Sequence, residues 1–227
     1  MRILLIDTAL SLCTAAVFED SAALAVRSEP MFKGHQERLA GFVRDAMAEA
    51  GTGFDALDRI GVTTGPGSFT GLRVGLAFAQ GFGAALGRPV VGISTLDALA
   101  ASLEPGRSSP EVVAALIDAR RGQVYARFWR RGVADGPAEA LSLEVAAARI
   151  AALGREPTLV GSGAALLADV FPAAVVIDLP GPAPGALARL VAAADPRQAP
   201  PEPQYLRAPD ATPPTRLPGQ PRVPVQP

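Results

Sequence analysis

The order of apolar and polar positions along the chain predicts strands that alternate with helices. Residues 2–8 form an apolar run that closes in a polar turn, and the two apolar runs that follow complete a predicted antiparallel meander of three strands. Apolar residues then recur at helical spacing over 35–50, opposite a charged face. Strand-like runs stand before and after a predicted helix over 70–86. Such alternation implies a partly parallel sheet.

The second half of the chain begins again in a similar way. An apolar run closes with Ile117 and Asp118, and a turn and a second strand follow, as they do after Ile6 and Asp7. This weak internal repeat suggests a duplicated α/β architecture.

Beyond residue 195 the character of the chain changes, because 11 of its 22 prolines lie there. Proline cannot supply the hydrogen bonds of helices and sheets, so this segment is expected to be extended or disordered. We expect the globular part to end near residue 195, apart from local docking of the stretch PQYLR.

Composition restricts the class of protein. Hydrophobic residues make up 49% and charged residues 19%, which is typical of a globular chain. The longest apolar stretch is shorter than the roughly 20 residues that span a bilayer, and the N-terminus meets Asp7 before a signal peptide is complete. Basic residues number 21 and acidic residues 22, so no net positive charge indicates nucleic acid. With Cys13 as the single cysteine, a cytoplasmic protein without a membrane contact is expected.

A glycine-rich stretch, GPGSFTGLR, precedes the predicted helix over 70–86. It lacks the lysine of a P-loop and the spacing of a dinucleotide-binding loop, and Pro66 removes one amide donor. Ser68 or Thr70 is a natural N-cap for the helix. A tight capped turn and an anion contact at the helix N-terminus both remain open.

The helix itself carries small residues at every fourth position: Gly71, Gly75, Ala79, Gly83 and Gly87. Each glycine inside a helix costs roughly 0.8–1.0 kcal/mol relative to alanine, so the repetition indicates that another backbone approaches this stripe closely. Arg73 and Gln80 are its polar residues, so little of the helix suits water. The helix is either the centre of a core or half core and half interface.

Asp7 and Asp118 could hold a metal-bound phosphate, or each could cap a turn after its strand. His35 is the only histidine, and no second imidazole lies one turn away to complete a metal site. No catalytic residue and no metal-binding residue is therefore predicted.

Several segments together resemble the TsaB family, the bacterial tRNA threonylcarbamoyladenosine biosynthesis proteins B. They are IDTALSLCTAAV, GHQERL, GVTTGPGSFTGLRVGLAFAQG, VVGISTLDAL, IDARRGQVYA and PQYLR, of which GPGSFTGLR is the most specific. The resemblance covers about residues 3–207 and implies an actin-like ATPase fold, an α/β fold of two ribonuclease H-like lobes with mixed sheets. The expected divisions are a first lobe at 1–101, a second lobe at 102–195 whose last helix could return to the first, and a tail at 196–227.

The resemblance also implies a function. TsaB is a non-catalytic subunit that activates its paralogue TsaD, which transfers a threonylcarbamoyl group to adenosine in tRNAs that read codons beginning with adenosine. The ATPase TsaE joins them, and tRNA is reached only indirectly. TsaD binds metal through H-x-x-x-H, whereas the second histidine position here is Leu39, and the turn after Asp118 carries Arg120 and Arg121 instead of glycines. No cofactor is therefore expected.

A phosphotransferase of the sugar-kinase type and a metallopeptidase-like protein are the alternatives, and both lack residues they would need. Vestigial phosphate turns are expected at Asp7, Thr8 and Asp118. On the scaffold hypothesis the two helices at 35–50 and 70–86 dock with TsaD as a four-helix bundle, or with a second copy when TsaD is absent. The expected interface residues are Leu39, Phe42, Val43, Ala46, Gly71, Arg73, Gly75, Phe78 and Ala79.

Overall fold

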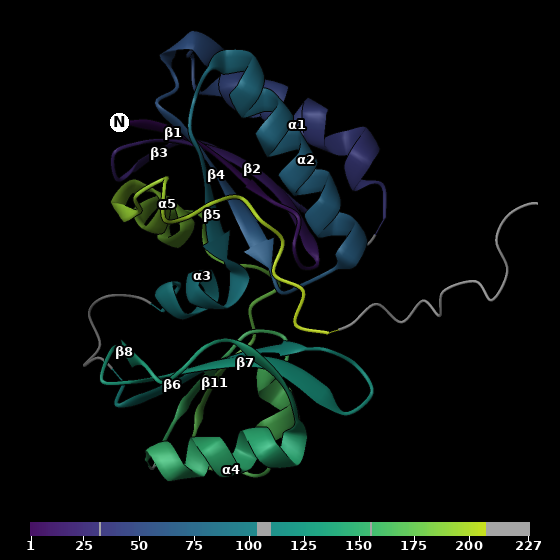
Figure 1. Cartoon of the computed structure of the whole chain (residues 1–227), viewed down its shortest axis with the longest axis vertical. Helices are drawn as coiled ribbons and strands as arrows, with labels where there is room; N and C mark the ends of the chain where they lie inside the picture. The colour runs from purple at the N-terminus through teal and green to yellow at the C-terminus, as the bar shows by residue number, and fades with distance from the viewer. Residues whose placement is uncertain (32, 104–109, 155, 208–227) are drawn as a thin grey trace, which may run out of the picture.

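The protein contains two mixed β-sheets that lie one above the other along its long axis (Figure 1). The computed structural model describes residues 1–31, 33–103, 110–154 and 156–207. A short helix, α3 (Thr95–Ala101), lies between the sheets and packs against both. Within the described residues, no helix is both long and apolar enough to cross a membrane.

The first sheet has the strand order β3-β2-β1-β4-β5. Its first three strands form the antiparallel meander predicted from the apolar runs, and β4 and β5 lie parallel to β1. The strands are β1 (Arg2–Asp7), β2 (Leu12–Glu19), β3 (Ala22–Pro30), β4 (Arg59–Gly65) and β5 (Val90–Ser94).

Helices cover both faces of the first sheet because β1 is apolar on both sides. Leu4 and Ile6 point into a core beneath α1 (His35–Glu49) and α2 (Phe69–Leu86). Ile3 and Leu5 point the other way, into a core completed by α5 (Pro184–Ala193). The last helix of the described residues, α5, thus packs on the first sheet, and a 3-10 turn at Phe54–Ala56 precedes β4.

The second sheet has the order β11-β10-β6-β7-β8, with β9 also paired to β7. One face packs on α4 (Leu143–Leu153) and a 3-10 turn at Ala164–Leu167, and the other packs on α3. Its strands are β6 (Val112–Asp118), β7 (Gln123–Arg130), β8 (Val133–Ala134), β9 (Glu139–Ser142), β10 (Thr158–Val160) and β11 (Val175–Ile177). Two mixed sheets that each begin with a hairpin confirm the predicted actin-like α/β fold.

Helix α2 begins and ends as its sequence predicts. Ser68 is the N-cap, and its hydroxyl oxygen accepts a hydrogen bond from the Gly71 amide at 3.2 Å. Gly87 closes the helix in the left-handed region with a φ of 62°, which costs glycine little.

The small-residue stripe of α2 faces the inside of the fold, which corrects part of the expected interface. Gly71, Gly75 and Ala79 are buried. A Cβ added at Gly71 would overlap the Thr8 carbonyl oxygen, and one added at Gly75 would overlap the Thr8 hydroxyl. The stripe exists because the chain turns past the helix after β1, so these three residues are not available to a partner.

The apolar face of α1 is also internal. Leu39, Phe42, Val43 and Ala46 are each at most 6% exposed and belong to the core above the first sheet. The helical spacing is the one predicted, but the face is occupied by the chain's own strands β2 and β3. These four residues are therefore not interface residues.

The described part of the chain continues past α5 in an extended course along the first sheet. The amide of Gly92 in β5 donates to the Ala199 carbonyl at 2.9 Å, and the Gln204 amide donates to the Thr64 carbonyl at 2.8 Å. The packed chain thus extends from residue 196 through the expected docking stretch PQYLR to residue 207. The remainder of the expected tail lies outside the described residues.

Two glycines of α2 provide a direct test of which side is inside. Gly81→Ala should raise the free energy of unfolding by up to about 1 kcal/mol, because nothing lies within 4 Å of its added Cβ. Gly75→Ala should lower that free energy by about 1–3 kcal/mol, because the helix must shift away from Thr8. Urea unfolding of the two variants beside the wild type measures both changes, and equal effects would contradict the assignment.

Candidate functional site

The two carboxylate oxygens of Asp7, at the end of β1, differ in their hydrogen bonding. Its Oδ1 accepts hydrogen bonds from the Thr63 hydroxyl at 2.7 Å and from the Ala9 amide at 3.0 Å. Its Oδ2 is buried and has no hydrogen-bond partner in the described chain. Burial raises the pKa of Asp7, and the bonds from Thr63 and Ala9 and the nearby His35 oppose that rise. This buried carboxyl favours its protonated form.

The two residues after Asp7, Thr8 and Ala9, hold the glycine loop and α2 in place by hydrogen bonds. The Thr8 hydroxyl donates to the Gly71 carbonyl at 2.8 Å, and the Ser68 amide donates to the Ala9 carbonyl at 2.7 Å. Gly67 faces that same Ala9 carbonyl too closely for any Cβ to fit. The loop is therefore a docking turn for the chain itself, and the capped-turn interpretation accounts for it.

Asp118, at the end of β6, is tied to its own turn. Its Oδ1 accepts from the Arg120 amide at 2.8 Å, and its Oδ2 lies 3.3 Å from the Arg120 guanidinium. Arg120 and Arg121 both adopt positive φ angles, 62° and 54°, which side chains other than glycine rarely adopt. A tight arginine turn therefore stands where a phosphate-binding turn would need glycines.

The arrangement does not fit a bound nucleotide or metal. Thr8 has its hydroxyl committed to α2, Asp7 is buried, and Asp118 is held by Arg120. A Cβ at Gly181 would lie 3.4 Å from the Asp7 Oδ2, so the loop near Gly181 closes over this carboxylate. Among the described residues, no group of three or more His, Cys, Asp or Glu side chains could hold a metal ion.

The outward side of α2 is the other candidate site, and it is largely apolar. We call it the α2 docking face, and it consists of exposed Ala77, Gly81, Ala84 and Ala85 with half-buried Val74, Phe78 and Leu86. Nothing in the described chain lies within 4 Å of a Cβ added at Gly81. Phe78 stacks on Phe82, with ring centroids 5.5 Å apart, and so remains partly exposed at the edge of the core.

Two polar residues of α2, Arg73 and Gln80, are both held by the segment after α5. The Arg73 guanidinium lies 3.8 Å from the centroid of the Phe69 ring, and its Nε donates to the Tyr205 hydroxyl at 3.4 Å. The Gln80 amide donates to the Pro201 carbonyl at 2.7 Å. Within the described chain, the Arg73 guanidinium thus contacts a ring and a hydroxyl.

Of the expected interface residues, Arg73 and Phe78 have exposed surface, and the other seven are buried. Sequence reasoning missed Ala77, Gly81 and Ala85, although they form a second small-residue stripe at the same spacing of four. That stripe was a usable signal for an outward contact. Tyr205 lies in the stretch PQYLR that was expected to dock, but its contact with α2 was not predicted, since nothing local relates it to a helix far back in the chain.

Comparison with known proteins decides the family. A family model described as TsaD, tRNA N6-adenosine threonylcarbamoyltransferase, matches residues 29–179. The Escherichia coli tRNA threonylcarbamoyladenosine biosynthesis protein TsaB is 36% identical over 168 residues, which cover 72% of each chain. The chain belongs to the TsaB family.

Other relatives extend the TsaB match over almost the whole chain. An uncharacterised protein of Mycobacterium tuberculosis is 36% identical over 214 residues, covering 93% of this chain and 94% of its own. Among solved structures, an uncharacterised Pseudomonas aeruginosa protein with similarity to the peptidase YeaZ aligns with a TM-score of 0.76 at 31% identity, over 91% of this chain and 99% of its own. YeaZ from the same organism aligns with a TM-score of 0.72 at 30% identity, over 90% and 99%.

The raised pKa of Asp7 predicts a specific dependence of stability on pH. Because the unfolded chain releases this proton at lower pH, the stability from protonated Asp7 is present below the ordinary pKa of 3.8 and is lost as pH rises through the folded value. Asp7→Asn keeps the acceptor oxygen without the charge, so its stability relative to wild type should increase as the pH rises from about 4 to neutral pH. Urea unfolding across that range measures the difference, and a difference that falls with pH would contradict the assignment.

Proposed function

We propose that this TsaB-family chain is a non-catalytic scaffold that activates TsaD in the biosynthesis of threonylcarbamoyladenosine in tRNA. The chain acts in the cytoplasm by forming a heterodimer with TsaD, which carries out the transfer, and TsaE joins the complex. Contact with tRNA comes mainly through TsaD. When TsaD is absent, the same surface forms a homodimer.

The observation that carries this proposal is the α2 docking face. An exposed helix face built from alanine, glycine, valine and phenylalanine is poorly suited to water and well suited to another helix. Small residues at Ala77, Gly81 and Ala85 allow a partner helix to approach closely, as small residues do at helix interfaces. Gly41 of the neighbouring α1 also has nothing within 4 Å of an added Cβ. The pair α1 and α2 is thus suited to meet a second pair.

The two aspartate turns support a role without catalysis. A phosphotransferase needs phosphate turns with free amides and ionised carboxylates, whereas Asp7 is buried and Asp118 is held by Arg120. A metallopeptidase needs a cluster of ligands, and the described residues contain no such group. Both alternatives therefore lack a site to act from.

Docking can be tested by replacing each of two exposed helix alanines with arginine. Ala77→Arg on α2 should weaken binding to TsaD by about a hundredfold or more, because it places a charge in the centre of an apolar contact. Ala148→Arg on the exposed side of α4 is the matched control and should bind normally. Titration calorimetry with purified TsaD measures both constants, and mass measurement of the complex gives its stoichiometry.

Both variants should unfold at nearly the temperature of the wild type, since each alanine is exposed. Normal TsaD binding by Ala77→Arg would mean that the interface lies on another surface. An unchanged homodimer in Ala77→Arg would show that self-association uses a different face.

The purified chain is expected to hydrolyse no ATP and to hold no stoichiometric transition metal. Thr8 and Asp118 are engaged within the fold, and Asp7 is buried beneath the loop near Gly181, so these residues are poorly placed to bind a metal-bound phosphate. Phosphate release assays and elemental analysis of the purified protein measure the two properties. Turnover by the isolated chain, or one tightly held iron or zinc per chain, would contradict the scaffold assignment.

A further inference from the structure

Residues 199–207, which we call the strap, connect α2 to both sheets. The strap begins beside β5, the edge strand of the first sheet, where Ala199 accepts from the Gly92 amide at 2.9 Å. It continues to the end of β4, where the Gln204 amide donates to Thr64 at 2.8 Å. These two backbone hydrogen bonds cover the edge that the first sheet would otherwise expose.

The strap then runs beside the first turns of α2. Pro201 accepts from Gln80, and Tyr205 accepts from Arg73 while its ring lies 5.3 Å from that of Phe69. Tyr205 and Phe69 remain 45% and 46% exposed. Together they form an exposed aromatic pair that continues the α2 docking face beyond the helix N-terminus.

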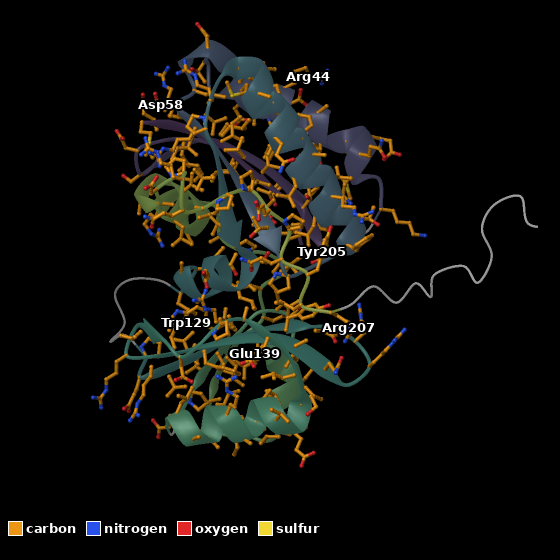
Figure 2. All side chains as sticks on the ribbon, viewed as in Figure 1. Arg44, Asp58, Trp129, Glu139, Tyr205 and Arg207 are labelled. Atoms are coloured by element: carbon orange, nitrogen blue, oxygen red, sulfur yellow. The ribbon has the colours of Figure 1, made fainter. Side chains whose placement is uncertain are left out.

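The end of the strap reaches the second sheet. Arg207 donates to the Gln123 side chain and lies 5.9 Å from the ring of Tyr125, both on β7. Figure 2 shows Tyr205 and Arg207 on this segment, in the space between the two sheets. One short stretch of chain therefore contacts the docking helix and both sheets.

The strap is held at separate points and is not packed along its length. A cavity of about 420 Å³ lies beneath it, between residues 198–204 and the ends of β4 and β5. The hydroxyls of Thr64 and Ser94, which line this cavity, are buried without a hydrogen-bond partner in the described chain. Pro200, Pro201 and Pro203 have no amide hydrogens, so the strap cannot form a continuous ladder with β5. A segment held in this way is able to detach without unfolding the sheet.

We propose that the strap is the part of the docking surface that couples partner binding to the relation between the two sheets. TsaD covers Tyr205 together with the α2 docking face, and it therefore binds the seated strap better than the detached one. By linkage, docking holds the strap on β5 and, through Arg207, holds the second sheet in place. This inference rests on the proposed function, because it assigns a regulation to the same docking face.

The test uses the full chain and measures hydrogen exchange at two backbone amides that are bonded across the strap. Exchange at Gly92 and Gln204 should slow by about tenfold when TsaD binds, although both amides belong to the strap junction and not to the α2 docking face. Tyr205→Ala should weaken TsaD binding by about tenfold and abolish that slowing, because the aromatic contact is lost. Tyr205→Phe keeps the ring and should behave nearly as the wild type. Val133→Ala, at an exposed position on β8, is the control and should change neither measurement.

The results separate this proposal from the proposed function. If Ala77→Arg abolishes TsaD binding but TsaD leaves exchange at Gly92 and Gln204 of the wild type unchanged, the docking proposal stands and the strap proposal is wrong. Normal binding by Tyr205→Ala would also overturn it. The wild-type exchange measurement needs no variant, so it decides the question even if Tyr205→Ala does not fold.

Discussion

Thr8 and the first turns of α2 approach each other so closely that only glycine fits between them. The carbonyl of Thr8 occupies the space of a Cβ at Gly71, and its hydroxyl occupies that of a Cβ at Gly75 while donating to the Gly71 carbonyl. Each glycine destabilises a helix by roughly 0.8–1.0 kcal/mol relative to alanine. Gly71 and Gly75 therefore weaken α2 unless the burial of other side chains compensates for this loss of stability. The offset comes from Leu72 and Leu76, which fill the core against the first sheet.

This one contact also determines how the turn after β1 is used. The turn after β1 is where an actin-like fold would hold a phosphate, yet here its hydroxyl and its Ala9 carbonyl are occupied by α2 and by the loop before it. Asp7 is left buried beside them, with its pKa raised by that burial. The same packing that closes the turn brings α2 up to the surface of the molecule, with its opposite side uncovered.

The two sheets are joined through α3, whose Leu96 and Leu99 pack into the apolar core on one face of the second sheet. Arg127 of β7 donates to both carboxylate oxygens of Asp97 on α3, at 2.5 and 2.6 Å, and the ion pair is largely shielded from water. Burial raises the pKa of Asp97, and the charge of Arg127 opposes this rise. The strap adds a second connection on another side of the junction, through Arg207. The orientation of the sheets therefore rests on the apolar contacts of α3, on this ion pair and on a short segment of chain.

The sequence alone determined much of the local structure: the antiparallel meander and the long helices followed from periodicity, and turn chemistry limited the cap of α2 to Ser68 or Thr70. The actin-like fold was expected from the resemblance to the TsaB family. The sequence could not determine which side of α2 faces inward. Residues 71, 75, 79 and 83 and residues 77, 81 and 85 are both small and apolar at a spacing of four, so periodicity fits either orientation. Only the tertiary structure decides, because the Thr8 turn and Val90 fill the space beside the first stripe and leave Gly81 open. The docking of PQYLR was expected, but the partners of Tyr205 were not predictable for a related reason, since its contacts with Phe69 and Arg73 join distant parts of the chain that only the completed fold brings together.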